Sequence, residues 1–154
     1  MDLAVVIYHA ARAAFWRATW EGREHIVTLT EVENYILSHC EALADHSFEE
    51  DPTVTIFRRS DNNQRFAAIK NVGRRSVDAG QTGRIDILNV SLDPRLVASL
   101  RTRGEGFRPA WRMNRNRWVT ILLDGSVPDD EIRSYLDTSY KFAGRKGGKS
   151  SGRK

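Results

Sequence analysis

Cysteine, histidine and proline are scarce in this chain of 154 residues, which has one Cys, four His and four Pro. The single cysteine, Cys40, excludes an intramolecular disulfide. No Cys or His residues have the spacing of a structural zinc site, and we predict no metal and no other cofactor. No apolar run is long enough to span a bilayer. No basic residue precedes the short apolar run at 3–8, so a secretory signal is not expected. We therefore expect a cytoplasmic protein without a membrane partner.

Motifs of catalysis are missing as well. No nucleophile lies beside a base in a recognisable motif, and no glycine-rich loop opens a helix. Cys40 falls on the apolar stripe of an expected helix, where a free cysteine behaves as a small core residue. Tyr140 is expected to be a buried hydroxyl with a hydrogen-bond partner. The sequence predicts that the protein is not an enzyme.

The net charge of +4 conceals an uneven distribution along the chain. Residues 28–57 contain seven acidic residues and no Lys or Arg, whereas residues 58–117 contain fourteen basic and five acidic residues. Such asymmetry indicates a polyanionic partner for the middle of the chain. Solvated surface charge, paired within the molecule with the acidic stretch, explains the pattern equally well.

The most informative stretch is 107–140. Apolar side chains alternate with Arg108 and Arg112 over 107–113, the period of a half-buried strand whose arginines face solvent. Residues 114–117 then form a turn, and the β-branched, mostly apolar run 118–123 returns as a second strand. Pro128 and the acidic residues after it begin a helix with an apolar stripe. We predict a hairpin with a basic tip, followed by a helix that packs on the sheet.

The remaining elements follow from caps and turns. Two overlapping capping boxes, Thr28 with Glu31 and Thr30 with Glu33, predict the start of a helix, and its apolar stripe continues through Cys40 and Leu43. Strands are expected at 53–57, 65–72 and 84–92. Asp93 and Pro94 begin a short helix that Gly104 ends. The resulting order is helix, three strands, helix, two strands, helix, in an α+β domain.

The domain is expected to occupy residues 28–143. Residues 1–27 form an N-terminal extension whose composition is compatible with a short helix, and it carries the aromatic residues Phe15, Trp16 and Trp20. Residues 144–154 contain mostly glycine, serine, lysine and arginine, so a disordered basic tail is predicted. Such a tail could tether the domain to phosphates or only add solubility.

The sequence resembles the MmcQ/YjbR-like family of small bacterial proteins over about 28–143. The resemblance depends on the combination of Met113-Asn114, Trp118, the Leu-Asp-Gly strand end at 123–125 and Ser139-Tyr140. It implies a frataxin-like two-layer α/β sandwich, with an antiparallel five-stranded sheet and helices on one face (α-β3-α-β2-α). Members are described as DNA-binding proteins, so DNA is the partner that the resemblance implies.

This chain departs from the family pattern near the hairpin tip. Arg112 and Arg117 stand where members often have histidine. Both replacements favour contacts with phosphate, because arginine stays charged and binds oxyanions with a planar fork of donors.

Two functions of different classes therefore stay open. In the first, non-specific DNA binding, basic and amide side chains on the sheet face and hairpin tips contact phosphates, namely Arg58, Arg59, Arg65, Arg108, Arg112, Asn114, Arg115 and Arg117. Trp111 and Trp118 could stack on bases, but their alternation favours the core. In the alternative, a protein-protein adaptor, a protein partner binds the open sheet face and the N-terminal aromatic segment.

Overall fold

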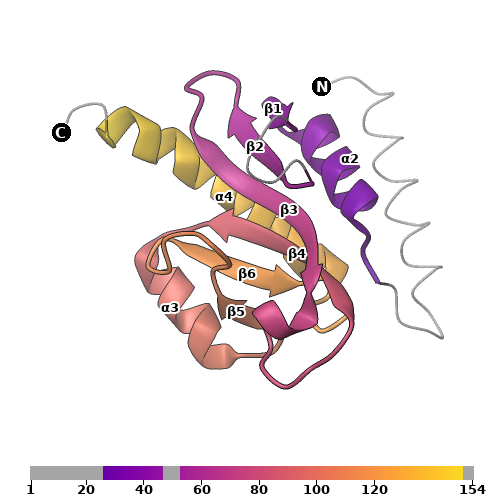
Figure 1. Cartoon of the computed structure of the whole chain (residues 1–154). Coiled ribbons are helices and arrows are strands. Elements are labelled where there is room, and N and C mark those ends of the chain that lie inside the picture. The colour runs from indigo at the N-terminus through magenta and orange to yellow at the C-terminus, as the bar shows by residue number, and fades with distance from the viewer. Residues whose placement is uncertain (1–25, 47–52, 151–154) are drawn as a thin grey trace.

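The protein is an α+β structure in which one antiparallel sheet is covered by helices (Figure 1). The computed structural model describes residues 26–46 and 53–150, with only the backbone described for 146–150. The N-terminal extension, with Phe15, Trp16 and Trp20, lies outside the described residues. The elements are, in chain order, α2 (Leu29–His39), β1 (Ala42–Asp45), β2 (Thr55–Arg59), β3 (Arg65–Gly73), the 3-10 turn η1 (Arg74–Ser76), β4 (Arg84–Ser91), α3 (Pro94–Arg103), β5 (Phe107–Pro109), β6 (Trp118–Leu122) and α4 (Asp129–Ser150).

The described sheet has six strands in the order β1-β2-β3-β4-β6-β5, and every neighbouring pair is antiparallel. The prediction of five strands was wrong because β1 was assigned to the preceding helix. That helix ends at His39, and Cys40 already has extended backbone angles. Ala42–Asp45 then pairs with β2. Alanine, leucine and glutamate are good helix formers, so pairing with β2 overrides local propensity here.

Helix starts follow the predicted caps. The Thr28 hydroxyl accepts a hydrogen bond from the Glu31 backbone, and Glu31 accepts one from the Thr28 backbone, which completes the capping box. Asp93 caps α3, with Pro94 in its first turn. Gly104 ends α3 with φ of 81°, a conformation that favours glycine.

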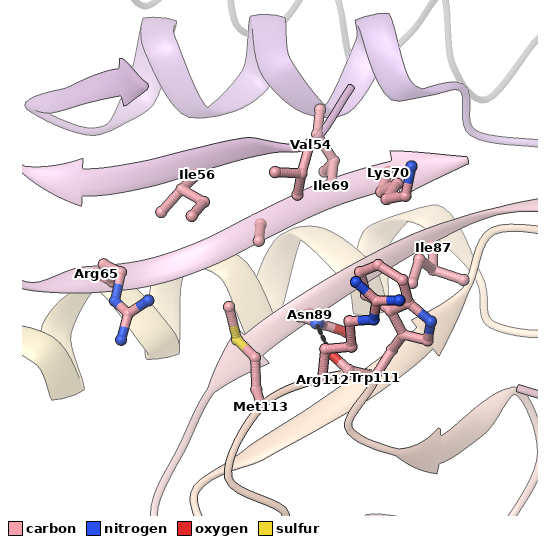
Figure 2. Close-up of a pocket in the computed structure, with 11 residues that line it drawn as sticks. Val54, Ile56, Arg65, Ile69, Lys70, Ile87, Asn89, Trp111, Arg112 and Met113 are labelled. Atoms are coloured by element: carbon pink, nitrogen blue, oxygen red, sulfur yellow. Dashed lines mark hydrogen bonds between the residues drawn. The ribbon is translucent and has the colours of Figure 1, made fainter. Parts of the chain in front are cut away.

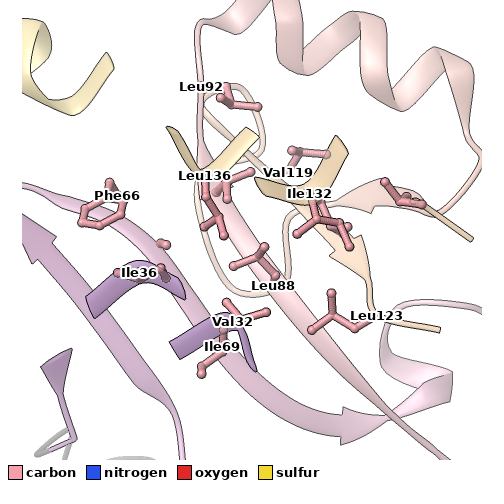
Figure 3. Packing of buried hydrophobic residues seen from close by; sticks show 14 of the residues in the cluster. Val32, Ile36, Phe66, Ile69, Leu88, Leu92, Val119, Leu123, Ile132 and Leu136 are labelled. Atoms are coloured by element: carbon pink, nitrogen blue, oxygen red, sulfur yellow. The ribbon is translucent and has the colours of Figure 1, made fainter. Parts of the chain in front are cut away.

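The main core lies between the sheet and the three described helices (Figure 3). Each strand contributes alternate side chains to this helix-covered face, as Leu88 of β4 and Val119 of β6 illustrate. The helices contribute the apolar side chains that pack against these strand residues, namely Val32 and Ile36 of α2 and Ile132 and Leu136 of α4. Burial on this face accounts for the apolar stripes of α2 and α4.

One hydrogen-bonded side chain ties α4 to two strands of the core. The Ser139 hydroxyl, which is fully buried, donates to the Phe66 carbonyl at 2.6 Å. It also accepts a hydrogen bond from the Ser91 backbone N–H at 3.2 Å. The neighbouring Tyr140 ring packs edge-on against Phe66, and its hydroxyl donates to the Glu41 carbonyl. The Ser-Tyr pair therefore has a packing role.

The opposite face of the sheet, which we call the open face, is also apolar. Val72, Ile85, Ile87 and Leu122 form one cluster, which Trp111 covers in part. A second cluster consists of Val54, Ile56 and Ala68, and Met113 packs against it. Both covering side chains come from the segment between β5 and β6, so this segment lies across the open face.

Helix α4 continues beyond Ala143, where the basic tail was expected to begin. The backbone is helical to Ser150, so the predicted boundary does not hold for 144–150, and 151–154 lie outside the described residues. Among the helices of the described ranges, none has a stretch both long and apolar enough to cross a bilayer. The likeness to frataxin stays a prediction.

Candidate functional site

Residues 110–117 form a loop across the open face, which we call the basic loop. The predicted strand 107–113 was too long, because β5 ends at Pro109. Arg112 has φ of 56°, a left-handed conformation that interrupts a strand and that non-glycine residues rarely adopt. Beyond Pro109 the alternation therefore belongs to a loop, in which Trp111 and Met113 pack on the sheet and Arg112 is exposed.

Two polar side chains of the open face fix this loop. The Asn89 amide of β4 donates to the Trp111 carbonyl at 3.0 Å (Figure 2). The Trp111 N–H donates to the Thr120 hydroxyl of β6 at 2.9 Å. The Thr120 hydroxyl in turn donates to the Asn89 side-chain oxygen at 2.5 Å. Asn89 and Thr120 are buried on an otherwise apolar face. Because the three bonds form a closed set, they satisfy the buried polar atoms and hold the backbone just before Arg112.

Backbone contacts order the rest of the basic loop. The Asn114 carbonyl accepts hydrogen bonds from the N–H groups of Arg117 and Trp118, and its side chain accepts one from the Asn116 N–H. Arg101 of α3 donates to the Arg115 carbonyl at 2.9 Å. None of these bonds uses the side chain of Arg112, Arg115 or Arg117, and all three residues are exposed.

Four of the predicted site arginines are exposed. Arg112, Arg115 and Arg117 belong to the basic loop, and Arg65 begins β3. Arg65 and Arg112 line the same pocket on the open face. The ion pairs found among the described residues include none of these four side chains. The predicted Asn114 is also exposed, at the turn of the loop.

Two predicted arginines have partners within the fold. The Arg59 guanidinium makes two hydrogen bonds to the Asp61 carboxylate, donates to the Tyr140 carbonyl at 2.7 Å, and lies 4.0 Å from the centre of the Tyr140 ring. The hydrogen bonds from Arg59 lower the pKa of Asp61. Arg58 lies 3.8 Å from the Asp45 carboxylate of β1. Arg59 therefore joins the end of β2 to α4.

Arg108 is also held by the fold. Its guanidinium donates to the carbonyls of Gly104 and Phe107, and it lies 3.5 Å from the Asp78 carboxylate. Asp78 also pairs with Arg74, which donates to Asp124 at 2.8 Å. Burial raises the pKa of Asp124, but hydrogen bonds from Ser126 and Arg74 bring it below its usual value. These contacts fasten the segment between β3 and β4 to the ends of β5 and β6.

Sequence reasoning missed the pair that positions the basic loop, Asn89 and Thr120. A signal was present, because each is a polar residue at a position of its strand that shares a face with apolar neighbours. Lys70 was missed as well. It lines the pocket on the open face and has a hydrogen bond to the Thr53 hydroxyl.

The titratable groups of the described part have packing roles. Burial raises the pKa of the Cys40 thiol to about 11, so little thiolate forms near neutral pH. Within the described ranges, no group of three or more His, Cys, Asp or Glu side chains could hold a metal ion.

The class of protein follows from the architecture, an α+β fold with an antiparallel sheet and three helices in the described part. The family follows from the match of residues 37–142 to the model of the YjbR family. The chain belongs to the YjbR family.

Relatives of known sequence support this assignment. The chain is 30% identical over 110 residues to the uncharacterized protein YjbR of Escherichia coli, which covers 70% of this chain and 83% of that protein. It is 29% identical over 96 residues to the uncharacterized protein YyaQ of Bacillus subtilis, covering 62% of this chain and 80% of that protein.

Solved structures show the same fold. A crystal structure of a Pseudomonas syringae protein superimposes with a TM-score of 0.70 at 28% identity, covering 75% of this chain and 98% of that one. The crystal structure of the Deinococcus radiodurans protein DR2400 matches with a TM-score of 0.61 at 22% identity, covering 79% and 82%. The second likeness concerns the fold alone.

Proposed function

We propose that this protein binds nucleic acid, most simply double-stranded DNA, through phosphate contacts made by the basic loop. The observation that carries the proposal is the exposure of Arg112, Arg115 and Arg117 on one ordered loop, without an ion pair among the described residues. Arg65, the first residue of β3, adds a fourth cation. Arginine is suited to this task because its planar fork of donors binds phosphate oxygens in pairs.

The aromatic side chains favour phosphate contacts over base stacking. Trp118 is 7% exposed within β6, and Trp111 lies half-buried against the open face. The Arg112 guanidinium covers the Trp111 ring at 4.9 Å from its centre. A single-stranded partner that stacks on exposed rings therefore has less support than a duplex contacted along its backbone. Such contacts position the protein without reading sequence.

A matched pair of variants tests the proposal by fluorescence anisotropy with a labelled duplex across a salt series. The loop variant is Arg112/Arg115/Arg117→Gln, and the control is Arg145/Lys146/Lys149→Gln near the C-terminus, which removes the same charge. The wild-type dissociation constant is expected at roughly 10⁻⁴ to 10⁻⁶ M in physiological salt. The loop variant should bind about tenfold or more weakly and lower the salt slope by about 2 to 3.

The control variant distinguishes an effect of the basic loop from an effect of lower net charge. If both variants lose affinity equally, net charge and the C-terminal residues explain binding and the basic loop is not the site. If the wild-type chain does not bind even at low salt, nucleic-acid binding itself is contradicted.

We also propose that the protein has a binding role without catalysis. Supporting this, the Ser139 hydroxyl is bonded to two backbone groups in the core, and burial raises the pKa of Cys40. The adaptor alternative is supported in the described part by exposed apolar side chains, among them Leu43 on the edge strand β1, which is 53% exposed. Its N-terminal portion lies outside the described residues. Binding of a protein partner through apolar contacts should persist as salt rises, whereas DNA binding should decrease.

A further inference from the structure

The basic loop forms one wall of a pocket on the open face (Figure 2). The floor is apolar and consists of Ile56 of β2, Ala68 of β3 and Ile87 of β4. Trp111 and Met113 of the basic loop stand beside it. A concave, mostly apolar surface with a few polar groups at its edge is the usual form of a small-molecule site.

The charged side chains that line this pocket are all cations. Arg65 and Lys70 come from β3 and Arg112 from the basic loop, and no carboxylate is found among the described residues that line it. The floor therefore favours an apolar body, and the rim favours an anionic group. Together they define an amphipathic anion as the ligand class.

The place of the anionic group follows from the contacts of Trp111. The Arg112 guanidinium lies 4.9 Å and the Lys70 ammonium 5.9 Å from the centre of this ring, so both cations gather at the same end of the pocket. Arg65 lies at the other end (Figure 2). A guanidinium that stacks on an indole keeps its edge of N–H donors for a carboxylate. Lys70 has a hydrogen bond to Thr53.

Hydrogen bonds from the sheet fix the backbone at this end of the pocket. Arg112 has φ of 56°, and the residue before it is held through both its N–H and its carbonyl by Thr120 and Asn89. A rare conformation that the surrounding hydrogen bonds impose is typical of binding sites. The fold therefore holds the backbone at Arg112 in place without a ligand.

We propose that this pocket binds a small carboxylate with an aromatic or branched aliphatic body. The carboxylate contacts Arg112, and the body lies over Ile56, Ala68 and Ile87. This site goes beyond nucleic-acid binding, because the pocket uses Arg112 but neither Arg115 nor Arg117. A bound carboxylate would compete with phosphate for Arg112.

The test is an NMR titration of the full chain, recording backbone amide shifts with 3-phenylpropanoate and with its neutral amide, 3-phenylpropanamide. The acid should give saturable shifts centred on Ala68, Asn89 and Met113 and bind about tenfold more tightly than the amide, since it gains a charge-assisted contact. Arg112→Gln should remove that difference. Arg95→Gln, on a side chain 97% exposed on α3, should leave binding unchanged.

A second variant, Ala68→Leu, fills the floor and should abolish binding of both probes while the rest of the spectrum keeps its native dispersion. The proposal is overturned if acid and amide bind equally, if Arg112→Gln has no effect, or if neither probe gives saturable shifts in the pocket. It is also overturned if thymidine monophosphate shifts these residues and the acid does not, which would assign the pocket to nucleic acid alone. Arg115/Arg117→Gln should weaken DNA binding but not binding of the acid, so the two proposals can fail separately.

Discussion

Arg59 and Arg112 lie on opposite sides of the sheet and have different surroundings. On the helix-covered side, Arg59 is bonded to Asp61 and to a carbonyl of α4, and its guanidinium lies against the Tyr140 ring. On the open face, Arg112 also lies against an aromatic ring, that of Trp111, but no ion pair is found for it within the described residues. Arg59 thus stabilises the fold, whereas Arg112 is one of the arginines that we propose contact a partner.

Because some arginines are partnered within the fold, the net charge of a segment overstates the charge that can attract a polyanion. Residues 58–117 carry a strong excess of basic residues, yet Arg58, Arg59, Arg74 and Arg108 have partners within the fold. The charge that can attract a polyanion is therefore smaller and more localised than the sequence total. Three of the exposed arginines without an ion pair among the described residues, Arg112, Arg115 and Arg117, belong to the basic loop.

The largest expected effect tests the helix-covered face. Ser139→Ala should lower the free energy of unfolding by about 2–3 kcal/mol, because the Phe66 carbonyl and the Ser91 N–H each lose a buried hydrogen-bond partner. Urea denaturation measures it. Ser134→Ala, an exposed position of the same helix, should change stability by less than about 0.5 kcal/mol. Equal effects at the two positions would contradict the role given to Ser139.

A somewhat smaller effect tests the open face. Asn89→Ala removes the hydrogen bond to the Trp111 carbonyl and one to Thr120, so it should cost about 2 kcal/mol. The basic loop should also open more often, and the amide of Arg112 should exchange faster with solvent. Asn116→Ala on the exposed tip is the control. Unchanged exchange at Arg112 in the Asn89 variant would show that the loop is held by other contacts.

Comparison of Arg59 with Arg117 addresses the two classes of arginine directly. Arg59→Gln should lower stability by about 1 kcal/mol and leave DNA affinity unchanged. Arg117→Gln should do the reverse, with stability within about 0.5 kcal/mol of wild type and weaker DNA binding. Thermal unfolding and anisotropy report the two quantities on the same samples. Reduced DNA affinity in the Arg59 variant, at a temperature where it is folded, would contradict the assignment of Arg59 to the fold and Arg117 to DNA binding.

The smallest expected change in stability concerns Cys40. Burial raises the pKa of its thiol from 9.0 to about 11, so thiolate at pH 8 is about 100-fold scarcer than in the unfolded chain. Iodoacetamide should therefore react about 100-fold more slowly with the folded protein than with the protein in urea. Because the neutral thiol is favoured in the folded state, its contribution to stability is present below pH 9 and is lost as the pH rises toward 11. Equal rates in both states would contradict the raised pKa.

Local signals in the sequence predicted much of the fold. The caps at Thr28 and Asp93 and the apolar runs of β2, β3, β4 and β6 all depend on neighbouring residues, and the structure has these elements close to their expected bounds. Strand β1 could not be predicted in this way. Its residues favour a helix, and its extended conformation depends on pairing with β2, more than ten residues further along the chain.

The candidate site was predicted in part for the same reason. The exposed arginines of the basic loop follow from a polar turn between apolar segments, which is a local pattern. The hydrogen bond from Arg59 to the Tyr140 carbonyl joins residues 81 positions apart in the sequence. The hydrogen bond from Asn89 to the Trp111 carbonyl joins residues 22 positions apart. No spacing rule links such pairs, so the sequence could not separate the partnered arginines from the exposed ones.

The most direct test of the central claim is an NMR footprint of a short DNA duplex on the isotope-labelled full chain at low salt. If DNA binds through the basic loop, the amide shifts should concentrate at Arg65 and at 112–117. The amides of α2 and of Arg59 should shift little. Shifts confined to α2, or to the helix end beyond Ala143, would show that the exposed arginines of the basic loop are not the interface.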